Sequence, residues 1–99
     1  MYFQYQNCHI YPGELESVAL EHPDILEIGI YGIQDPKAQE LVAAVVVKKE
    51  QSKLTEEEVE KYINGHVEDF KKVRGGVKFV PSLPRNPQGK IIRSKLHLF

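Results

Sequence analysis

Apolar and polar residues alternate along one stretch of the chain, and this period of two predicts a β-strand with one buried face. Leu26, Ile28 and Ile30 form the apolar side of this strand. A second run, residues 41–48, is rich in valine and alanine, which is typical of a strand buried on both faces. Turn-forming residues at 34–37 separate the two runs. We therefore expect an antiparallel pair of strands.

Two further stretches have the apolar spacing of an amphipathic helix. Pro12 suits the first turn of the earlier one, and Pro23 should stop it near Glu21. The later helix begins with a capping box formed by Thr55 and Glu58. Its apolar stripe comprises Val59, Tyr62, Ile63, His66, Val67 and Phe70. The length of this stripe predicts a helix that continues to residue 71.

A short strand and a last helix complete the expected order of elements. The strand occupies residues 77–80, after a break at Gly75 and Gly76, and the helix begins near Ile91. This order predicts an α+β fold: a small sandwich with a mainly antiparallel three-stranded sheet covered by helices, plus an N-terminal hairpin-like loop. We expect residues 1–99 to form a single domain. Residues 1–4 resemble the remnant of a protease-cleavable tag, and we set them aside in predicting the fold.

The composition is ordinary for a globular protein, with 41% hydrophobic and 27% charged residues. The longest uninterrupted apolar run, residues 41–47, is too short to cross a membrane, so we expect no membrane partner. Cys8 is the only cysteine and cannot form an internal disulfide, which fits an intracellular protein. The tripeptide at residues 94–96 would be a peroxisomal address if it were terminal, so both peroxisome and cytoplasm stay open.

The net charge of -1 conceals two oppositely charged parts of the chain. All 14 acidic residues precede residue 71. The basic residues from there onward are Lys71, Lys72, Arg74, Lys78, Arg85, Lys90, Arg93 and Lys95. An anionic ligand would be drawn to this basic part. A free-standing module for nucleic acid or another polyanion is therefore one hypothesis, although the aromatic signature of RNA-binding domains is missing, which argues against nucleic acid.

One lysine in the basic part is set apart by the loop that carries it. Residues 83–93 read LPRNPQGKIIR. Pro84 and Pro87 stiffen the backbone, and Gly89 permits a φ angle that other residues avoid, directly before Lys90. The plainer interpretation is a proline-rich turn with a solvated lysine. In these basic surroundings, Lys90 is nevertheless the best candidate for a functional group.

Other kinds of site find less support in the sequence. A phosphate-binding P-loop would need a glycine where Pro84 stands and a serine or threonine where Ile91 stands. The four histidines are scattered and lack companions at the spacing of metal ligands, so we expect no metal site. The sequence also contains no recognisable hydrolase constellation.

Four motifs, in order along almost the whole chain, resemble a known family. They are YPGELE at residues 11–16, EHP at 21–23, KVRGGV at 72–77 and LPRNPQGKI at 83–91. Together they resemble the C-terminal domain of adenylate-forming enzymes. The similarity is greatest to the branch that holds insect luciferase-like proteins, fatty acyl-CoA synthetases and 4-coumarate-CoA ligases.

The resemblance implies part of a two-step acid–thiol ligase. In the family, a carboxylic acid and ATP with Mg²⁺ give an acyl adenylate and pyrophosphate, and coenzyme A then takes the acyl group as a thioester. The C-terminal domain is a mobile lid that presents the lysine matching Lys90 in the first step and the loop matching residues 4–11 in the second. The implied partners are ATP, CoA, a carboxylic acid and an N-terminal adenylation domain outside these 99 residues. Alone, the chain is expected to be inactive and to bind no cofactor.

The resemblance also implies roles for particular residues. Lys90 is the catalytic candidate, because an ammonium group can stabilise the charge that develops during adenylation. The candidates on the CoA or nucleotide side are Asn7, His9, Arg74, Gly75 and Gly89. Gln4, Asn7 and His9 depart from the lysine, glycine and glutamine usual in the family, which bears mainly on the thioester step. Asparagine can still adopt the left-handed conformation open to glycine. A luciferase-like lid is the alternative, since luciferases share this domain.

Overall fold

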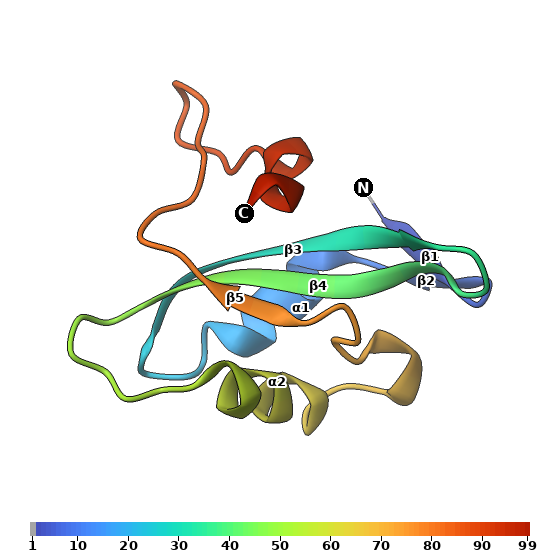
Figure 1. Ribbon diagram of the computed structural model, residues 1–99, viewed down its shortest axis with the longest axis horizontal. Helices are drawn as coiled ribbons and strands as arrows, with labels where there is room; N and C mark the ends of the chain where they lie inside the picture. Colours follow the sequence, from blue (N-terminus) through green and yellow to red (C-terminus); the bar gives the residue numbers. More distant parts are fainter. Residues whose placement is uncertain (1) are drawn as a thin grey trace.

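A long antiparallel pair of strands, β3 (Ile25–Asp35) and β4 (Gln39–Lys48), forms the centre of the computed structural model, which describes residues 2–99 (Figure 1). The antiparallel pair predicted from the hydrophobic pattern is therefore confirmed. Residues 42–47 of β4 are buried without interruption, so side chains on both faces of this strand are covered. The valine-rich run thus has the burial expected of a central strand.

Three shorter strands complete a five-stranded sheet. β5 (Val77–Phe79) lies parallel to β4 at residues 44–46, and β1 (Phe3–Tyr5) joins β4 through one residue pair. β2 (Cys8–Ile10) forms a hairpin with β1 and lies at one end of the strand order, with β3 at the other. The three predicted strands are present, and the hairpin-like loop adds two more. Residues 3 and 4, set aside above as resembling a tag, belong to β1.

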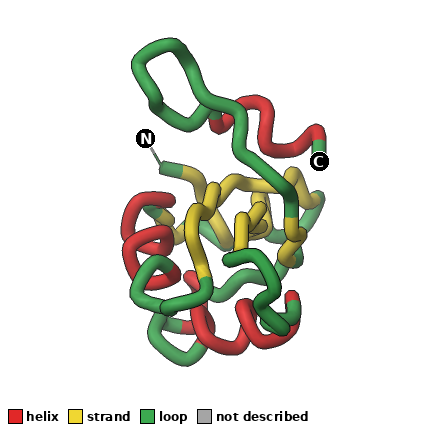
Figure 2. The backbone as a smooth tube through the Cα atoms, turned by 90° about the vertical axis from the view of Figure 1, so that its left-hand side faces the viewer, coloured by secondary structure: helices red, strands yellow, loops and turns green. Residues whose placement is uncertain are grey.

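Two helices cover one face of the sheet and the C-terminal segment covers the other, as Figures 1 and 2 show. α1 (Pro12–Ala19) and α2 (Glu56–Asn64) lie on the side of the larger core cluster. On the opposite face, Leu83 and Leu96 pack against valines of β4. The last predicted helix is a 3₁₀ helix, η2 (Arg93–Leu98), which starts slightly later than expected.

A glycine in β3 allows this C-terminal layer to pack closely on the sheet. A Cβ atom at Gly29 would lie 2.6 Å from Cδ1 of Leu96, closer than non-bonded atoms can approach. Leu96 is itself fully buried. Gly29 therefore leaves the space on β3 that the Leu96 side chain fills. The prediction of one buried face for this strand missed the second layer, because a glycine gives no apolar signal.

The prediction for the start of β3 is wrong by one residue. Leu26 was expected on the buried face but is 52% exposed, whereas Ile25 is 5% exposed. The register between β3 and β4 shifts between Ile25 and Glu27, as at a β-bulge. A bulge interrupts the alternation of side chains, so Ile25 and Ile28 both contribute to the core.

α2 begins as predicted and ends earlier. Thr55 Oγ1 accepts a hydrogen bond from Glu58 N at 3.1 Å, and Glu58 Oε1 accepts one from Thr55 N at 2.9 Å, which confirms the capping box. The helix ends at Asn64, because a glycine C-cap follows and Asn64 Oδ1 accepts a hydrogen bond from Val73 N at 2.8 Å. The chain between them contains a short 3₁₀ helix, η1 (Asp69–Lys71), where the longer α-helix was wrongly expected. No helix in the described part of the chain has the length and apolar character needed to cross a membrane.

Candidate functional site

Lys90 belongs to a hairpin-like loop, residues 84–92, that projects from the C-terminal layer (Figure 1). We call it the Lys90 loop. Two backbone hydrogen bonds of 2.9 Å each and one antiparallel bridge join its two stems. Lys90 is exposed, and within residues 2–99 its ammonium group makes no ion pair or hydrogen bond. The loop therefore presents a free cation on an ordered backbone.

An asparagine organises the tip of the Lys90 loop. Asn86 Oδ1 accepts hydrogen bonds from Gln88 N at 3.0 Å and from Lys90 N at 2.9 Å. The carbonyl oxygen of Asn86 accepts a third, from Gly89 N at 2.9 Å. Gly89 has a φ of 85°, the left-handed conformation that its position predicted. Asn86 was not singled out from the sequence, although an asparagine between two prolines is typical of such side-chain-stabilised turns.

An arginine on the incoming stem ties the loop to the sheet. Arg85 Nη1 donates to the carbonyl oxygen of Gly89 at 2.6 Å, inside the loop. Its Nε donates to Glu27 Oε1 of β3 at 3.1 Å, and its Nη2 forms an ion pair with the same oxygen. Glu27 lies 58 positions away in the sequence. Arg85 therefore joins the loop tip to the edge of the sheet.

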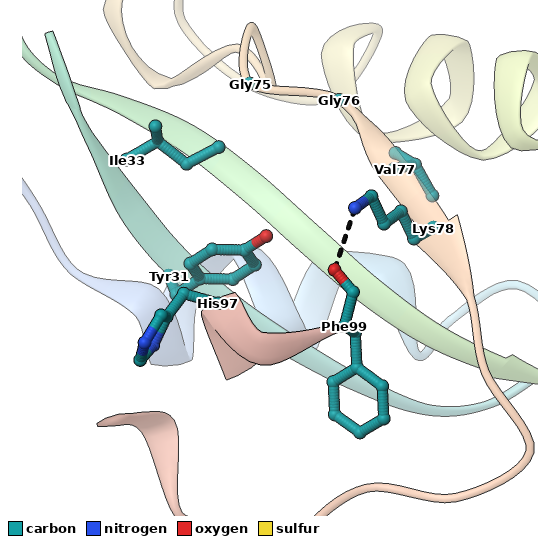
Figure 3. A pocket seen from close by; sticks show the side chains of 8 residues that line it. All are labelled: Tyr31, Ile33, Gly75, Gly76, Val77, Lys78, His97 and Phe99. Carbon is teal, nitrogen blue, oxygen red and sulfur yellow. Dashed lines mark hydrogen bonds between the residues drawn. The ribbon is translucent and has the colours of Figure 1, made fainter. Parts of the chain in front are cut away.

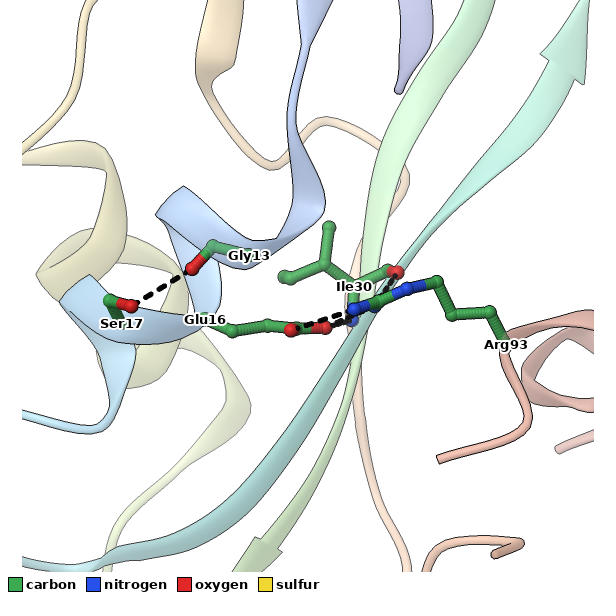
Figure 4. A network of polar contacts seen from close by, with 5 residues as sticks. All are labelled: Gly13, Glu16, Ser17, Ile30 and Arg93. Atoms are coloured by element: carbon green, nitrogen blue, oxygen red, sulfur yellow. Dashed lines mark hydrogen bonds and ion pairs between the residues drawn. The ribbon is translucent and has the colours of Figure 1, made fainter. Parts of the chain in front are cut away.

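A second arginine follows the loop and reaches the other layer of the molecule (Figure 4). Arg93 Nη2 donates to Glu16 Oε1 of α1 at 2.9 Å, and Arg93 Nη1 pairs with Glu16 Oε2. The same Nη1 donates to the carbonyl oxygen of Ile30 in β3 at 3.0 Å, while Ile30 N donates to Glu16 Oε2 at 2.9 Å. The hydrogen bonds to Glu16 raise the pKa of Arg93, and partial burial of the guanidinium opposes this shift. No local sequence pattern indicated this contact, because its partners are 77 positions apart.

The N-terminal hairpin carries two of the other candidates. Gln6 and Asn7 at its tip have φ angles of 49° and 67°, so Asn7 does take the left-handed conformation. Asn7 N donates to Gln39 Oε1 at 2.7 Å, which ties the tip to the start of β4. His9 is exposed and stacks on Tyr2, with 4.3 Å between the ring centroids. The tip and the stacked rings thus present polar groups to solvent.

Arg74 and Gly75 lie on the segment before β5. Arg74 makes side-chain contacts near the hairpin, whereas Gly75 packs its backbone against β4. The Arg74 guanidinium is 4.6 Å from the ring centroid of Tyr5 and donates to Asp69 Oδ2 at 3.0 Å. Arg74 therefore lies beside the hairpin. Gly75 N donates to the carbonyl oxygen of Val42 at 2.6 Å, and a Cβ atom at Gly75 would lie 2.9 Å from that oxygen. Close packing against β4 is sufficient to explain this glycine.

The candidates therefore fall into two groups. Asn7, His9 and Arg74 gather at the hairpin, whereas Lys90 and Gly89 belong to the Lys90 loop. Figure 1 shows the hairpin and the loop at opposite ends of the sheet. The candidates therefore form two separate sites rather than one.

A cavity of about 350 Å³ lies between the sheet and the C-terminal layer (Figure 3). It is lined by Tyr31, Ile33, Gly75, Gly76, Val77, Lys78, His97 and Phe99. Lys78 Nζ donates to the carbonyl oxygen of Phe99 at 2.7 Å across it. Burial raises the pKa of the Tyr31 hydroxyl. Among the candidates only Gly75 lines this cavity, and its close packing against Val42 of β4 explains its presence there.

The basic residues of the last part of the chain are largely paired with earlier acidic residues. The ion pairs are Lys71 with Glu14 and Glu68, Lys72 and Arg74 with Asp69, Arg85 with Glu27, and Arg93 with Glu16. The hydrogen bond to Glu14 raises the pKa of Lys71, although burial opposes this shift. The charge separation along the sequence is therefore not a separation on the surface, which weakens the polyanion hypothesis. Nor do any three His, Cys, Asp or Glu side chains of residues 2–99 form a metal-binding cluster.

Comparisons with known proteins agree with this fold. The family model described as the AMP-binding enzyme C-terminal domain matches residues 14–90. The chain is 44% identical to a luciferin 4-monooxygenase of Luciola mingrelica over 88 residues, 89% of this chain and 16% of that protein. It is 36% identical to a 4-coumarate–CoA ligase of Humulus lupulus over 93 residues, 94% of this chain and 17% of that protein.

A solved structure gives the same result in three dimensions. ATP-bound MatB from Rhodopseudomonas palustris superposes with a TM-score of 0.89 at 29% identity, covering 96% of this chain and 19% of that one. The chain thus spans about a sixth of the length of its curated relatives. The matched part includes most of α1, both long strands and, at its end, Lys90. The chain belongs to the family of AMP-binding enzyme C-terminal domains found in adenylate-forming enzymes.

Proposed function

We propose that this chain is the mobile lid of an ATP-dependent acyl-CoA synthetase, in which Lys90 assists the formation of an acyl adenylate. The observation that carries the proposal is the free ammonium group of Lys90 on a loop held at both stems. Most neighbouring cations are neutralised by carboxylates. An exposed lysine on an ordered loop can stabilise the negative charge of a substrate that a second domain holds.

Lys90 would act on the first half-reaction. A carboxylate oxygen attacks the α-phosphorus of ATP, the bond to pyrophosphate breaks, and negative charge shifts among the oxygens around phosphorus. The Lys90 ammonium would donate hydrogen bonds to these oxygens once docking of the lid excludes water. Because Asn86 already fixes the backbone at Lys90 N, little reorganisation would be needed when the lid closes.

We assign the hairpin to the second half-reaction, in which CoA takes the acyl group. Asn7, His9 and Arg74 offer polar and cationic groups of the kind that a phosphorylated thiol carrier requires. Arg74 is partly committed to Asp69 and Tyr5, so it would have to exchange partners to bind a phosphate. Gly75 is left out of this assignment because its packing against β4 explains it. ATP and its Mg²⁺ would be held mainly by the adenylation domain.

A luciferase-like lid is the second candidate, favoured by the 44% identity to the Luciola protein. The two functions differ in the fate of the adenylate. The test uses a two-domain protein in which this chain follows an adenylation domain of the same family. With ATP, Mg²⁺, CoA, dioxygen and a panel of carboxylic acids that includes luciferin, mass spectrometry should detect acyl-AMP and then acyl-CoA. Light emission without acyl-CoA would favour the luciferase, and the absence of any acyl-AMP would overturn the proposed function.

A further inference from the structure

Both stems of the Lys90 loop are held by arginine–glutamate pairs. Arg85 precedes Lys90 and binds Glu27 of β3, while Arg93 follows it and binds Glu16 of α1. β3 lies at the end of the strand order, so no strand within residues 2–99 neighbours its outer edge. Both arginines therefore attach the loop along one side of the sheet.

The pair between Glu16 and Arg93 is the firmer of the two. The Glu16 and Arg93 side chains are 14% and 25% exposed, against 32% and 42% for Glu27 and Arg85. It also satisfies both backbone groups of Ile30, a fully buried residue of the edge strand. Bidentate, partly buried pairs of this kind are more specific in geometry than exposed ones. Removing either Glu16 or Arg93 would leave the charge of the other side chain unpaired and one backbone group of Ile30, its N–H or its carbonyl oxygen, without a hydrogen bond.

Only a short, ordered stretch separates Arg93 from Lys90. Three residue steps span at most about 10 Å of chain. Ile91 packs against the second core cluster, and Ile92 N donates to the carbonyl oxygen of Pro84 at 2.9 Å. The position and orientation of Lys90 therefore depend on where Arg93 is held.

We propose that Glu16 and Arg93 are positioning residues for Lys90, holding the outgoing stem of its loop against the edge of β3. The inference rests on the proposed role of Lys90. Glu16 acts through Arg93 and contacts no reacting atom. A purely structural role predicts that both half-reactions weaken together when the pair is broken. A positioning role predicts that only the step that uses Lys90 slows.

The chain offers a matched control on the same helix. Glu14 also binds a distant cation, Lys71, with 2.6 Å between Oε1 and Nζ, but that contact leads to η1 rather than to the Lys90 loop. Glu14→Ala therefore breaks an ion pair between α1 and a remote segment without touching the stems. Glu16→Ala breaks the pair that leads to Lys90. Arg93→Lys, which keeps the charge but not the bidentate contact, serves if Glu16→Ala fails to fold.

The test combines the kinetics of the two-domain protein with NMR of the 99-residue chain. Glu16→Ala and Arg93→Lys should slow acid-dependent ATP–pyrophosphate exchange about ten- to a hundredfold, as for a catalytic group displaced by about 1 Å. Thioester formation from supplied acyl adenylate should change by less than about twofold, and Glu14→Ala should alter neither step. In the chain itself, ¹⁵N relaxation should show lower order at Lys90 in Glu16→Ala than in Glu14→Ala.

A double mutant separates the failure of this inference from that of the proposed function. If Glu16 acts through Lys90, adding Glu16→Ala to Lys90→Ala should cause no further loss of exchange. Fully additive losses, or equal losses in both half-reactions, would overturn the positioning role while leaving Lys90 catalytic. Exchange that is unaffected by Lys90→Ala alone would overturn the proposed function instead.

Discussion

Leu96→Ala should detach the C-terminal layer from the sheet. Leu96 is fully buried, packs with Leu83 and two valines of β4, and lies directly over Gly29. Removing a buried leucine side chain costs about 2–5 kcal/mol, and this small cluster can partly collapse, so we expect about 3 kcal/mol. That value corresponds to about a hundredfold increase in the opening equilibrium of the layer.

The assay for this prediction has a control on the same 3₁₀ helix. Leu98 is 71% exposed, so Leu98→Ala should change the free energy of unfolding by less than about 0.5 kcal/mol. Urea unfolding gives the free energy, and amide hydrogen exchange locates the loss. Faster exchange should concentrate in the C-terminal layer, while the amides of α1 and α2, on the other face of the sheet, keep their protection.

Gly29 supplies the decisive second mutation. In the wild-type chain, Gly29→Ala should cost about 1–3 kcal/mol because its Cβ would overlap Leu96. In the Leu96→Ala background the overlap is gone, so the same substitution should be neutral or stabilising, by up to about 1 kcal/mol. Equal effects of Gly29→Ala in the two backgrounds would show that Leu96 does not lie on Gly29, and would refute the packing described for this face.

Two other predictions concern Gly75 and Lys71. Gly75→Ala should lower the free energy of unfolding in urea by about 2 kcal/mol, because its Cβ would meet β4 backbone at 2.9 Å. Gly13→Ala is the control and should not destabilise the chain, because nothing lies within 4 Å of the added Cβ. Equal effects of the two substitutions would contradict the close approach. The pKa of Lys71 is raised from 10.5, so the folded chain binds this proton more tightly than the unfolded chain. The stability that the pair with Glu14 contributes should therefore be complete below pH 10.5 and decline above it. NMR titration of Lys71 Nζ should show this raised pKa in the wild type and a lower one in Glu14→Gln, and an unchanged value would contradict the pairing.

The elements that the sequence predicted well depend on local chemistry. The capping box of α2 needs only Thr55 and Glu58 three positions apart, and both of its hydrogen bonds are present. The end of α2 depends on the C-cap Gly65 and also on the contact of Asn64 with Val73, nine positions away, which periodicity within a helix cannot indicate. Leu26 was misplaced for a similar reason, since a bulge is a property of two paired strands.

The same division holds for the candidate site. Lys90 stood out because prolines and Gly89 mark its loop locally, and the left-handed φ of Gly89 followed from glycine's freedom. Glu16 and Arg93 could not be paired from the sequence, because their contact depends on how α1, β3 and the C-terminal layer meet. The charge pattern was misleading in its turn, since folding brings acidic and basic segments together.

The most direct test of the central claim is ATP–pyrophosphate exchange by the two-domain protein with Lys90→Ala, beside Lys95→Ala as the control. Both lysines are exposed, and neither has an ion-pair partner in the part of the chain that the structure describes. Loss of one preorganised charge contact costs about 3 kcal/mol, so Lys90→Ala should slow acid-dependent exchange about a hundredfold, and Lys95→Ala less than about twofold. Undiminished exchange in Lys90→Ala, or an equal fall in both variants, would contradict the role assigned to Lys90.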